Sequence, residues 1–263
     1  MPPVRPSRRL LALCCALAAG ACGHDDGNAP PTAAPGRPSG PLTVFAATSL
    51  TEVFEELGQA FEADHDGVTV TFNFAGSSDL ARQINEGGRA DVFASADEET
   101  MAAVTAAGNA AGPRVVARNG LAIIVEKGNP ERMSTLADLA RPGIVLVLCA
   151  PAVPCGRLAA AAFTKARVTP APASLEENVK AVVSKVTLGE ADAGIVYRSD
   201  AQGAADEAEG IDIGGGDDGT LQAVYPMAVT TTAANPVTAE AWVDFVLSSR
   251  GRRALQASGF LGP

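Results

Sequence analysis

The chain has 263 residues and an ordinary globular composition, with 47% hydrophobic residues and 30 acidic against 20 basic side chains. Residues 42–263 are enough to bury a sizeable core in one or two domains. The net charge of −10 argues against nucleic acid or an anionic lipid surface as the partner, since both attract basic proteins.

The first 21 residues have the pattern of a secretory signal peptide. Arg5, Arg8 and Arg9 precede the apolar stretch Leu10–Ala19, which is too short to span a bilayer, and small residues follow it. We therefore expect residues 1–21 to be removed. Their loss takes away three of the 20 basic residues and leaves 17 against 30 acidic ones, a net charge of −13.

Cys22 comes directly after this segment, and Ala19-Gly20-Ala21-Cys22 resembles the lipobox of bacterial lipoproteins. The resemblance implies a diacylated Cys22 at the new N-terminus, although Ala19 stands where that family usually has leucine. The alternative is a secreted protein with an unpaired Cys22. Residues 22–41 are rich in proline and glycine and lack apolar periodicity, which predicts a flexible tether between a membrane anchor and the folded part.

The segment Leu42–Phe61 reads as a buried strand, a short turn and an amphipathic helix. Ser49 followed by Glu52 fits the capping box, which predicts Ser49 as the helix N-cap. The first turn of a helix offers unpaired N–H groups and a partial positive charge, so a strand-to-helix turn of this kind is suited to hold an anion. Most such serines only cap, and one turn alone does not establish a site.

A second unit with the same pattern follows at Val68–Phe74, which alternates like a strand. The small, hydroxyl-rich turn Ala75–Asp79 comes next, and a helix from Leu80 ends at Gly87-Gly88. If the two strands are neighbours in a parallel sheet, both turns lie at the same sheet edge and aim their hydroxyl and N–H groups at one point.

The remaining chain continues to alternate between strands and helices, which predicts an α/β fold. The near-continuous apolar run Ile144–Leu148 suits a parallel sheet that is covered on both faces. The predicted strands are Asp91–Ala94, Leu121–Val125, Ile144–Leu148, Ala193–Tyr197, Ile211–Ile213 and Ala223–Val229. The predicted helices are Glu98–Ala107, Thr135–Leu139, Arg157–Ala166, Asn178–Leu188, Thr238–Leu247 and Gly251–Ala257.

Two cysteines remain in the folded part once Cys14 and Cys15 leave with the signal peptide and Cys22 is acylated. Outside the reducing cytosol this predicts a Cys149–Cys155 disulfide that closes a short loop. A metal or redox pair is the alternative, but no further cysteine or suitable histidine is present to complete a metal site.

Five segments of the chain can be compared, in order, with a known family. They are Val44–Thr51, Phe74–Ile84, Ala90–Asp97, Val153–Gly156 and Gly194–Asp200. In this order they resemble the successive signatures of the molybdate-binding proteins of bacterial ABC importers, and the resemblance spans the chain from about Leu42 to the C-terminus.

The resemblance implies a two-lobed fold of the type II periplasmic-binding-protein class, with two α/β sandwich lobes joined by a two-strand hinge. By this analogy residues 42–119 and 222–263 form lobe 1, and residues 120–221 form lobe 2. It also implies a protein that is not an enzyme, needs no cofactor, acts as a monomer and delivers its ligand to ABC permease subunits.

The family's ligand contacts, carried over by position, fall on five residues. The serine hydroxyls match Ser49 and Ser77, backbone N–H groups match Cys155 and Val179, and the tyrosine hydroxyl matches Tyr197. The family often has alanine at the position of Cys155, which a backbone donor tolerates. The resemblance implies molybdate as the ligand, and tungstate should bind nearly as well.

Three alternatives remain open from the sequence. A different oxyanion such as sulfate is the nearest one, and an organic anion would call for an arginine at the site, for which Arg82 and Arg157 are candidates although both read as solvated helix residues. A secreted serine hydrolase is remote, because the chain has no G-x-S-x-G motif and His65 follows the first helix at the end away from Ser49.

Overall fold

The computed structural model describes residues 36–213 and 221–263. The predicted signal peptide, Cys22 and most of the predicted tether lie outside these residues. The strands are β1 (Gly40–Ala47), β2 (Val68–Ala75), β3 (Val92–Ala94), β4 (Ala110–Glu126), β5 (Leu146–Cys149), β6 (Ser174–Glu176), β7 (Ala193–Tyr197), β8 (Ala208–Asp212) and β9 (Gln222–Thr230).

The helices fill the connections between these strands. They are α1 (Thr51–Asp64), α2 (Ser77–Asn85), α3 (Glu98–Ala106), α4 (Pro154–Ala166), α5 (Val179–Thr187), α6 (Arg198–Gly203), α7 (Pro236–Leu247) and α8 (Ser249–Ala257), with the 3-10 turns η1 (Thr48–Leu50) and η2 (Asp138–Ala140).

The strands are ordered β2-β1-β3-β9-β4-β7-β5-β6, with β8 on a further edge of β4. β1 runs parallel to both β2 and β3, and β5 runs parallel to both β6 and β7. The two strand–serine–helix units therefore lie side by side in a parallel sheet, which is the condition under which both turns share one sheet edge.

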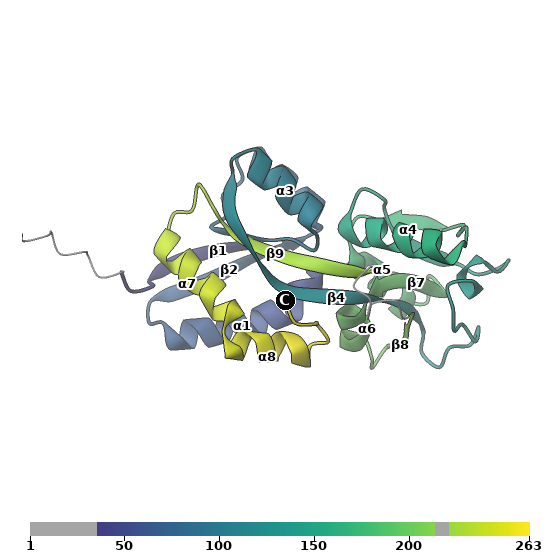
Figure 1. Ribbon diagram of the computed structural model, residues 1–263. Coiled ribbons are helices and arrows are strands. Elements are labelled where there is room, and N and C mark those ends of the chain that lie inside the picture. Colours follow the sequence, from purple (N-terminus) through teal and green to yellow (C-terminus); the bar gives the residue numbers. More distant parts are fainter. Residues whose placement is uncertain (1–35, 214–220) are drawn as a thin grey trace, which may run out of the picture. The chain divides into compact units, whose positions relative to one another are not determined.

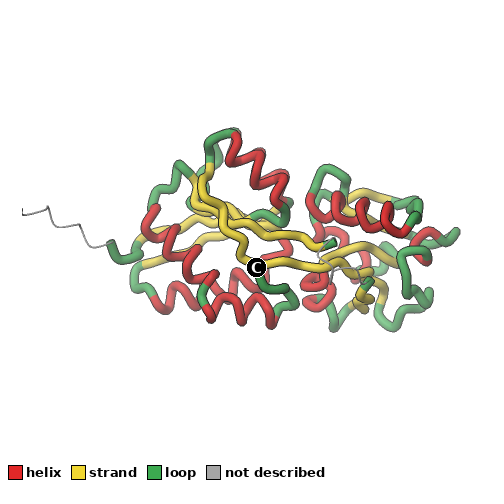
Figure 2. Tube along the Cα trace, viewed as in Figure 1, coloured by secondary structure: helices red, strands yellow, loops and turns green. Residues whose placement is uncertain are grey.

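Strands β4 and β9 cross between the two halves of this arrangement (Figures 1 and 2). Residues Ala110–Gly120 of β4 pair with β9, and residues Leu121–Val125 pair with β7. We call the half around β1, β2, β3 and β9 lobe 1, and the half around β5, β6 and β7 lobe 2. This two-lobed α/β architecture is the predicted fold class, whereas the residue boundaries of the lobes stay a prediction.

The two faces of the lobe 1 sheet are covered by different helices, because alternate strand residues point to opposite faces. Phe45 and Phe93 pack with α2 and α3 in one cluster, whereas Val44 and Val92 belong to the larger core. Figure 1 shows α3 on one side of the sheet and α1, α7 and α8 on the other. Trp242 of α7 is fully buried and makes edge contacts with Phe54 and Phe61 of α1.

Several elements differ from those predicted from the sequence. β4 is 17 residues long, although only Leu121–Val125 was predicted, because Gly112 and Pro113 interrupt its apolar pattern. The register of β4 against β9 shifts between Ala111 and Arg114, so an irregularity accommodates the proline. β1 begins at Gly40, inside the predicted tether, and α6 and β6 were not predicted.

Ser49 is not a helix N-cap, which corrects the capping-box prediction. It lies inside η1, and Ala47 and Leu50 are the N-caps of η1 and α1, without side-chain cap bonds. The Ser49 hydroxyl instead bonds the Tyr225 hydroxyl, and Glu52 pairs with Lys180.

Candidate functional site

One pocket collects the N-terminal ends of five helical elements from both lobes. Its lining includes the N-cap residues of η1, α2, α4, α5 and α6, which are Ala47, Gly76, Val153, Asn178 and Tyr197. Each of these ends presents N–H groups without an intrahelical acceptor and a partial positive charge. The pocket therefore has the electrostatics of an anion site without containing a cation.

All five residues carried over from the family resemblance line this pocket and are buried. Ser49 and Ser77 come from lobe 1, and Cys155, Val179 and Tyr197 come from lobe 2. The structure thus brings together residues that lie up to about 150 positions apart in the chain.

The Ser77 hydroxyl is already oriented by its surroundings. The backbone N–H of Ala96 donates to Ser77 Oγ at 3.0 Å. Since a backbone N–H can only donate, Ser77 acts as the acceptor and keeps its own proton for a group in the pocket.

The Tyr197 hydroxyl is a buried donor with no hydrogen-bond partner among the described residues. Burial raises the pKa of this phenol well above its usual value, and the nearby Tyr225 and Asp200 add to the rise. The phenol is therefore protonated at neutral pH and offers its proton to the pocket. An unpaired polar group at such depth costs free energy unless a ligand satisfies it.

Two further helix starts face the pocket from lobe 2. Asn178 caps α5 by accepting from the N–H of Ala181 at 3.0 Å, which leaves the N–H groups of the first residues, beginning with Val179, at the pocket. Cys155 lies in the first turn of α4 and is joined to Cys149 by a disulfide, with the two Cα atoms 5.8 Å apart. The bond ties the end of β5 to the start of α4.

The pocket has a cavity volume of about 20 Å³. Within the described part of the chain no lysine or arginine lines it, and its single charged lining residue, Glu177, is exposed. Arg82, one of the two candidate arginines, lies outside this lining. Its pKa is raised mainly by Asp79 and Glu86, with a smaller contribution from Glu177. Among the described residues the pocket therefore has no arginine clamp of the kind that an organic anion would require.

The two lobes approach each other closely around the pocket. A Cβ atom placed on Gly76 would lie 2.6 Å from the carbonyl oxygen of Glu177, so only glycine fits at this N-cap. Ser78 of α2 donates to the carbonyl oxygen of Ala152 at 2.8 Å. The structure is thus a closed arrangement in which both lobes touch at the rim.

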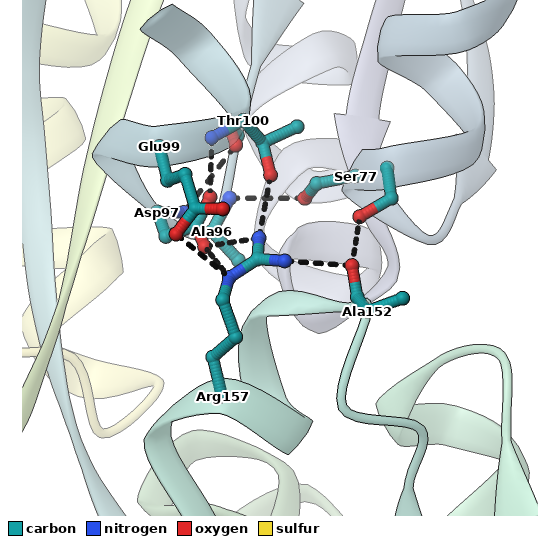
Figure 3. Close-up of polar contacts among 9 residues, drawn as sticks. Ser77, Ala96, Asp97, Glu99, Thr100, Ala152 and Arg157 are labelled. Atoms are coloured by element: carbon teal, nitrogen blue, oxygen red, sulfur yellow. Dashed lines mark hydrogen bonds and ion pairs between the residues drawn. The ribbon is translucent and has the colours of Figure 1, made fainter. Parts of the chain in front are cut away.

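Arg157 ties the lobes together and is not the solvated helix residue that the sequence suggested. Its guanidinium bonds Asp97 Oδ2 at 2.5 Å and 3.0 Å, the Thr100 hydroxyl at 2.9 Å and the carbonyl oxygen of Ala152 at 2.6 Å. Figure 3 shows it reaching from α4 to the start of α3. Asp97 caps α3 through its other oxygen, which accepts from the N–H of Thr100 at 2.9 Å.

A family model for bacterial extracellular solute-binding proteins matches residues 42–261. The chain belongs to this family. The protein is 40% identical over 244 residues to the molybdate-binding protein ModA of Mycobacterium tuberculosis H37Rv, and this match covers 92% of each chain.

Solved structures share the fold of this solute-binding protein. The periplasmic molybdate-binding protein of Azotobacter vinelandii matches with a TM-score of 0.72 at 20% identity, covering 84% of this chain and 99% of that one. The sulfate-binding protein SubI of M. tuberculosis H37Rv matches with a TM-score of 0.73 at 19% identity, covering 84% and 86%. Both likenesses concern the fold.

Family membership makes this chain an extracellular solute-binding protein and not an enzyme. Any solute in its pocket is accordingly a ligand and not a cofactor. Over residues 36–213 and 221–263, no helix has the length and apolar character needed to cross a membrane.

Two contacts around the site of this solute-binding protein could not be predicted from the sequence. Tyr225 lies on the crossing strand β9, behind Ser49, and reads as an ordinary strand position. Arg157 was a candidate only as a clamp for an organic anion, since it lies 60 positions from Asp97 and no local pattern links the two. Only the fold brings Tyr225 to Ser49 and Arg157 to Asp97.

Proposed function

We propose that this protein captures molybdate, and also tungstate, in the pocket between its lobes and delivers the anion to an ABC permease. The observation that carries the proposal is the convergence of five helix N-termini, two serine hydroxyls and the unpaired Tyr197 hydroxyl on one pocket. The 40% identity to a protein named for molybdate binding supports the choice of anion.

The chemistry of the donors fits a fully deprotonated oxyanion. Molybdate has four acceptor oxygens and no proton near neutral pH, so hydroxyl and N–H donors satisfy it. Hydrogen phosphate carries a proton that needs an acceptor, and a site of donors alone rejects it. Sulfate has the same charge and shape as molybdate but is smaller, so cavity size must discriminate between the two.

The size of the cavity speaks against an organic anion. Its volume of about 20 Å³ exceeds the roughly 10–15 Å³ that one water requires. Pockets for organic ligands, in contrast, measure roughly 300–1,000 Å³. The pocket suits a single small inorganic ion.

We also propose how the protein is held outside the cell. The sequence supports a signal peptide over residues 1–21, a lipid anchor on Cys22 and a tether that ends near residue 41. A monomer with lobe 1 at 42–119 and 222–263 and lobe 2 at 120–221 would then present its closed form to the permease. Family membership supports the extracellular location of the folded part.

Calorimetric titration of the intact protein with molybdate, tungstate, sulfate and phosphate tests the ligand. We expect tight one-to-one binding of the first two anions. The combined Ser49→Ala and Ser77→Ala change should weaken molybdate binding by roughly two to four orders of magnitude, because each hydrogen bond to a charged group contributes about 1.5–3 kcal/mol.

Ser184→Ala is the matched control, since that exposed hydroxyl donates to the carbonyl oxygen of Lys180 on its own helix and lies outside the pocket lining. It should bind molybdate as the wild type does. Binding of sulfate in preference to molybdate would mean that the ligand is another oxyanion. If none of the four anions bound, the proposal would be refuted.

A further inference from the structure

The Cys149–Cys155 disulfide closes a short loop that connects β5 to α4. Cys149 is the last residue of β5, and Cys155 is the second residue of α4. Each cysteine is only 4% exposed, so the bond lies inside the protein. We call residues 149–155 the disulfide loop. The bond fixes the two ends of this loop to each other.

The disulfide loop forms part of the lobe 2 side of the pocket and of the contact with lobe 1. Its residues 153–155 line the pocket. The carbonyl oxygen of Ala152 accepts from the Ser78 hydroxyl of α2 at 2.8 Å and from the guanidinium of Arg157 at 2.6 Å, and Figure 3 shows the second of these contacts. The position of the loop therefore affects both a proposed ligand group and the closure of the lobes.

The sequence of the loop limits how its own backbone can hold it. Its two prolines have no N–H group to donate. The N–H of Ala150 donates to the carbonyl oxygen of Glu176 on β6 at 2.8 Å, which anchors the start of the loop, whereas the N–H of Val153 donates to Ala150 within the loop itself at 3.0 Å. The disulfide thus ties the end that β6 anchors to the end that carries the Cys155 N–H.

The start of α4 packs directly against the disulfide loop. A Cβ atom at Gly156 would collide with the carbonyl oxygen of Ala150, so only glycine allows this close approach. The loop and the first turn of α4 form one packed unit. A shift at Cys149 or Ala150 therefore also moves the N–H groups of α4 that face the pocket.

A loop that is ordered before the anion arrives gives tighter binding than a loop that the anion must order. In the second case the loss of conformational entropy opposes binding and lowers the affinity. Breaking the disulfide removes the constraint on the ends of the loop. The affinity for the anion should then fall even in protein that stays folded.

We propose that the Cys149–Cys155 disulfide is a redox-sensitive positioning element of the pocket, and that its reduction weakens the binding of the oxyanion. This inference rests on the proposed function, because it concerns how the same pocket holds its ligand. Cys149 lies outside the pocket lining and acts through Cys155.

The redox step needs a reductant, and a small dithiol supplies it. The S–S bond breaks and each sulfur gains one electron and one proton, while the dithiol loses two of each and closes to a cyclic disulfide. In an oxidising environment outside the cytosol the bond stays formed. The protein therefore has its higher affinity in the compartment where it meets its ligand.

Calorimetric titration with molybdate, in the absence of reductant, compares the wild type with the double variant Cys149→Ala and Cys155→Ala. The backbone N–H at position 155 is kept, so the comparison measures the loss of the bond and not of a ligand group. We expect the dissociation constant to rise about tenfold, comparable with the loss of one hydrogen bond. Both proteins are titrated well below their thermal midpoints.

Leu139→Ala is the matched control for a general loss of stability. Leu139 is buried and lies outside both the pocket lining and the disulfide loop. Its truncation leaves a cavity that lowers the thermal midpoint, but its dissociation constant should equal that of the wild type. An equal loss of affinity in this control would show that lower stability alone weakens binding, and would overturn the positioning role.

A reciprocal measurement uses the wild-type sequence. If reduction weakens binding tenfold, the bound anion must favour the oxidised protein by the same factor. The reduction potential of the disulfide, measured at equilibrium in dithiothreitol redox buffers, should therefore become about 30 mV more negative at saturating tungstate, since about 30 mV corresponds to tenfold for a two-electron couple. Tungstate is the probe because tungsten(VI) is harder to reduce than molybdenum(VI).

The variant with Ser49→Ala and Ser77→Ala is the control for this shift. Its disulfide is intact, but it should bind the anion poorly, so the same tungstate concentration should leave its reduction potential unchanged. A bond that only stabilises the fold would show no dependence on tungstate in either protein.

The outcomes separate this inference from the proposed function. Wild-type protein that binds none of the four anions overturns both. Wild-type binding together with unchanged molybdate affinity in the double cysteine variant, or with bound tungstate that leaves the reduction potential unchanged, overturns the positioning role alone. A tenfold loss in the double variant, unchanged affinity in Leu139→Ala and the expected shift in potential support it.

Discussion

Asp200 is a fully buried carboxylate whose charge acts on both tyrosines of the site. Its ion-pair partner is Lys180, with Nζ 3.4 Å from Oδ1, and neither carboxylate oxygen has a hydrogen bond of normal geometry within the described residues. Burial raises the pKa of Asp200 to about 6, with Lys180 opposing the shift. The ionised form of Asp200 therefore lowers the stability of the folded protein.

Because ionised Asp200 is unfavourable in the fold, the free energy of unfolding should depend on pH. The pKa of Asp200 is about 6 in the folded protein and about 3.9 in the unfolded chain. The folded state holds this proton more tightly, so its contribution to stability is complete below the unfolded value and is lost as the pH rises through about 6. The difference of about two units corresponds to about 3 kcal/mol.

Urea unfolding of the wild type and of Asp200→Asn between about pH 4 and pH 7 measures this effect. The free energy of unfolding of the wild type should fall relative to that of the variant as the pH rises. Parallel profiles for the two proteins would show that Asp200 has an ordinary pKa in the fold.

At the scale of elements, the start of α3 and the first turns of α4 hold the lobes together. Arg157 and Asp97 are about three-quarters shielded from solvent, with 26% and 21% of their side chains exposed. The planar guanidinium also bonds the Thr100 hydroxyl and the carbonyl oxygen of Ala152. Shielding and several simultaneous bonds make such a pair stronger than an isolated surface ion pair.

Because this pair bridges the lobes, breaking it should weaken ligand binding more than it lowers the stability of either lobe. We expect Arg157→Gln to raise the dissociation constant for molybdate about fivefold, a change on the order of 1 kcal/mol. Asp97→Asn should have a similar effect, since asparagine keeps the helix cap and removes only the charge.

A double-mutant cycle on the dissociation constants, measured by calorimetry, checks the coupling between the two side chains. The double variant should be little weaker than either single one. Strictly additive losses would mean that Arg157 and Asp97 act independently on closure.

Elements with a strong local pattern were predicted well from the sequence. Strand β7 was placed at its observed bounds, and helix α5 was placed within a residue at each end, because continuous apolar runs and helical periodicity are local signals. The long crossing strand β4 was missed, since Gly112 and Pro113 conceal it. The polar pairs of the site were missed as well, because a pair such as Arg157 and Asp97 exists only once the lobes have formed.

The whole molecule has a negative net charge, whereas its pocket is lined by helix N-termini that carry partial positive charge. After loss of the predicted signal peptide it has 17 basic against 30 acidic residues, a net charge of −13, yet the proposed ligand is a dianion. The helix N-termini attract that anion only locally, because their field falls off within the first turn. Net charge acts over a longer range, about 30 Å at 0.01 M ionic strength and about 8 Å at 0.15 M.

These two ranges predict an unusual salt dependence for capture. The association rate constant of molybdate, followed by stopped-flow fluorescence, should rise several-fold between about 0.01 M and 0.15 M ionic strength, because screening removes the long-range repulsion and leaves the short-range attraction. A variant with Glu55→Gln and Glu56→Gln, two exposed positions on α1 outside the pocket lining, should bind faster at low salt and depend less on salt. A rate constant that falls with added salt would mean that the converging helix ends dominate the field well outside the pocket, so that the anion is steered toward the site despite the net charge of the protein.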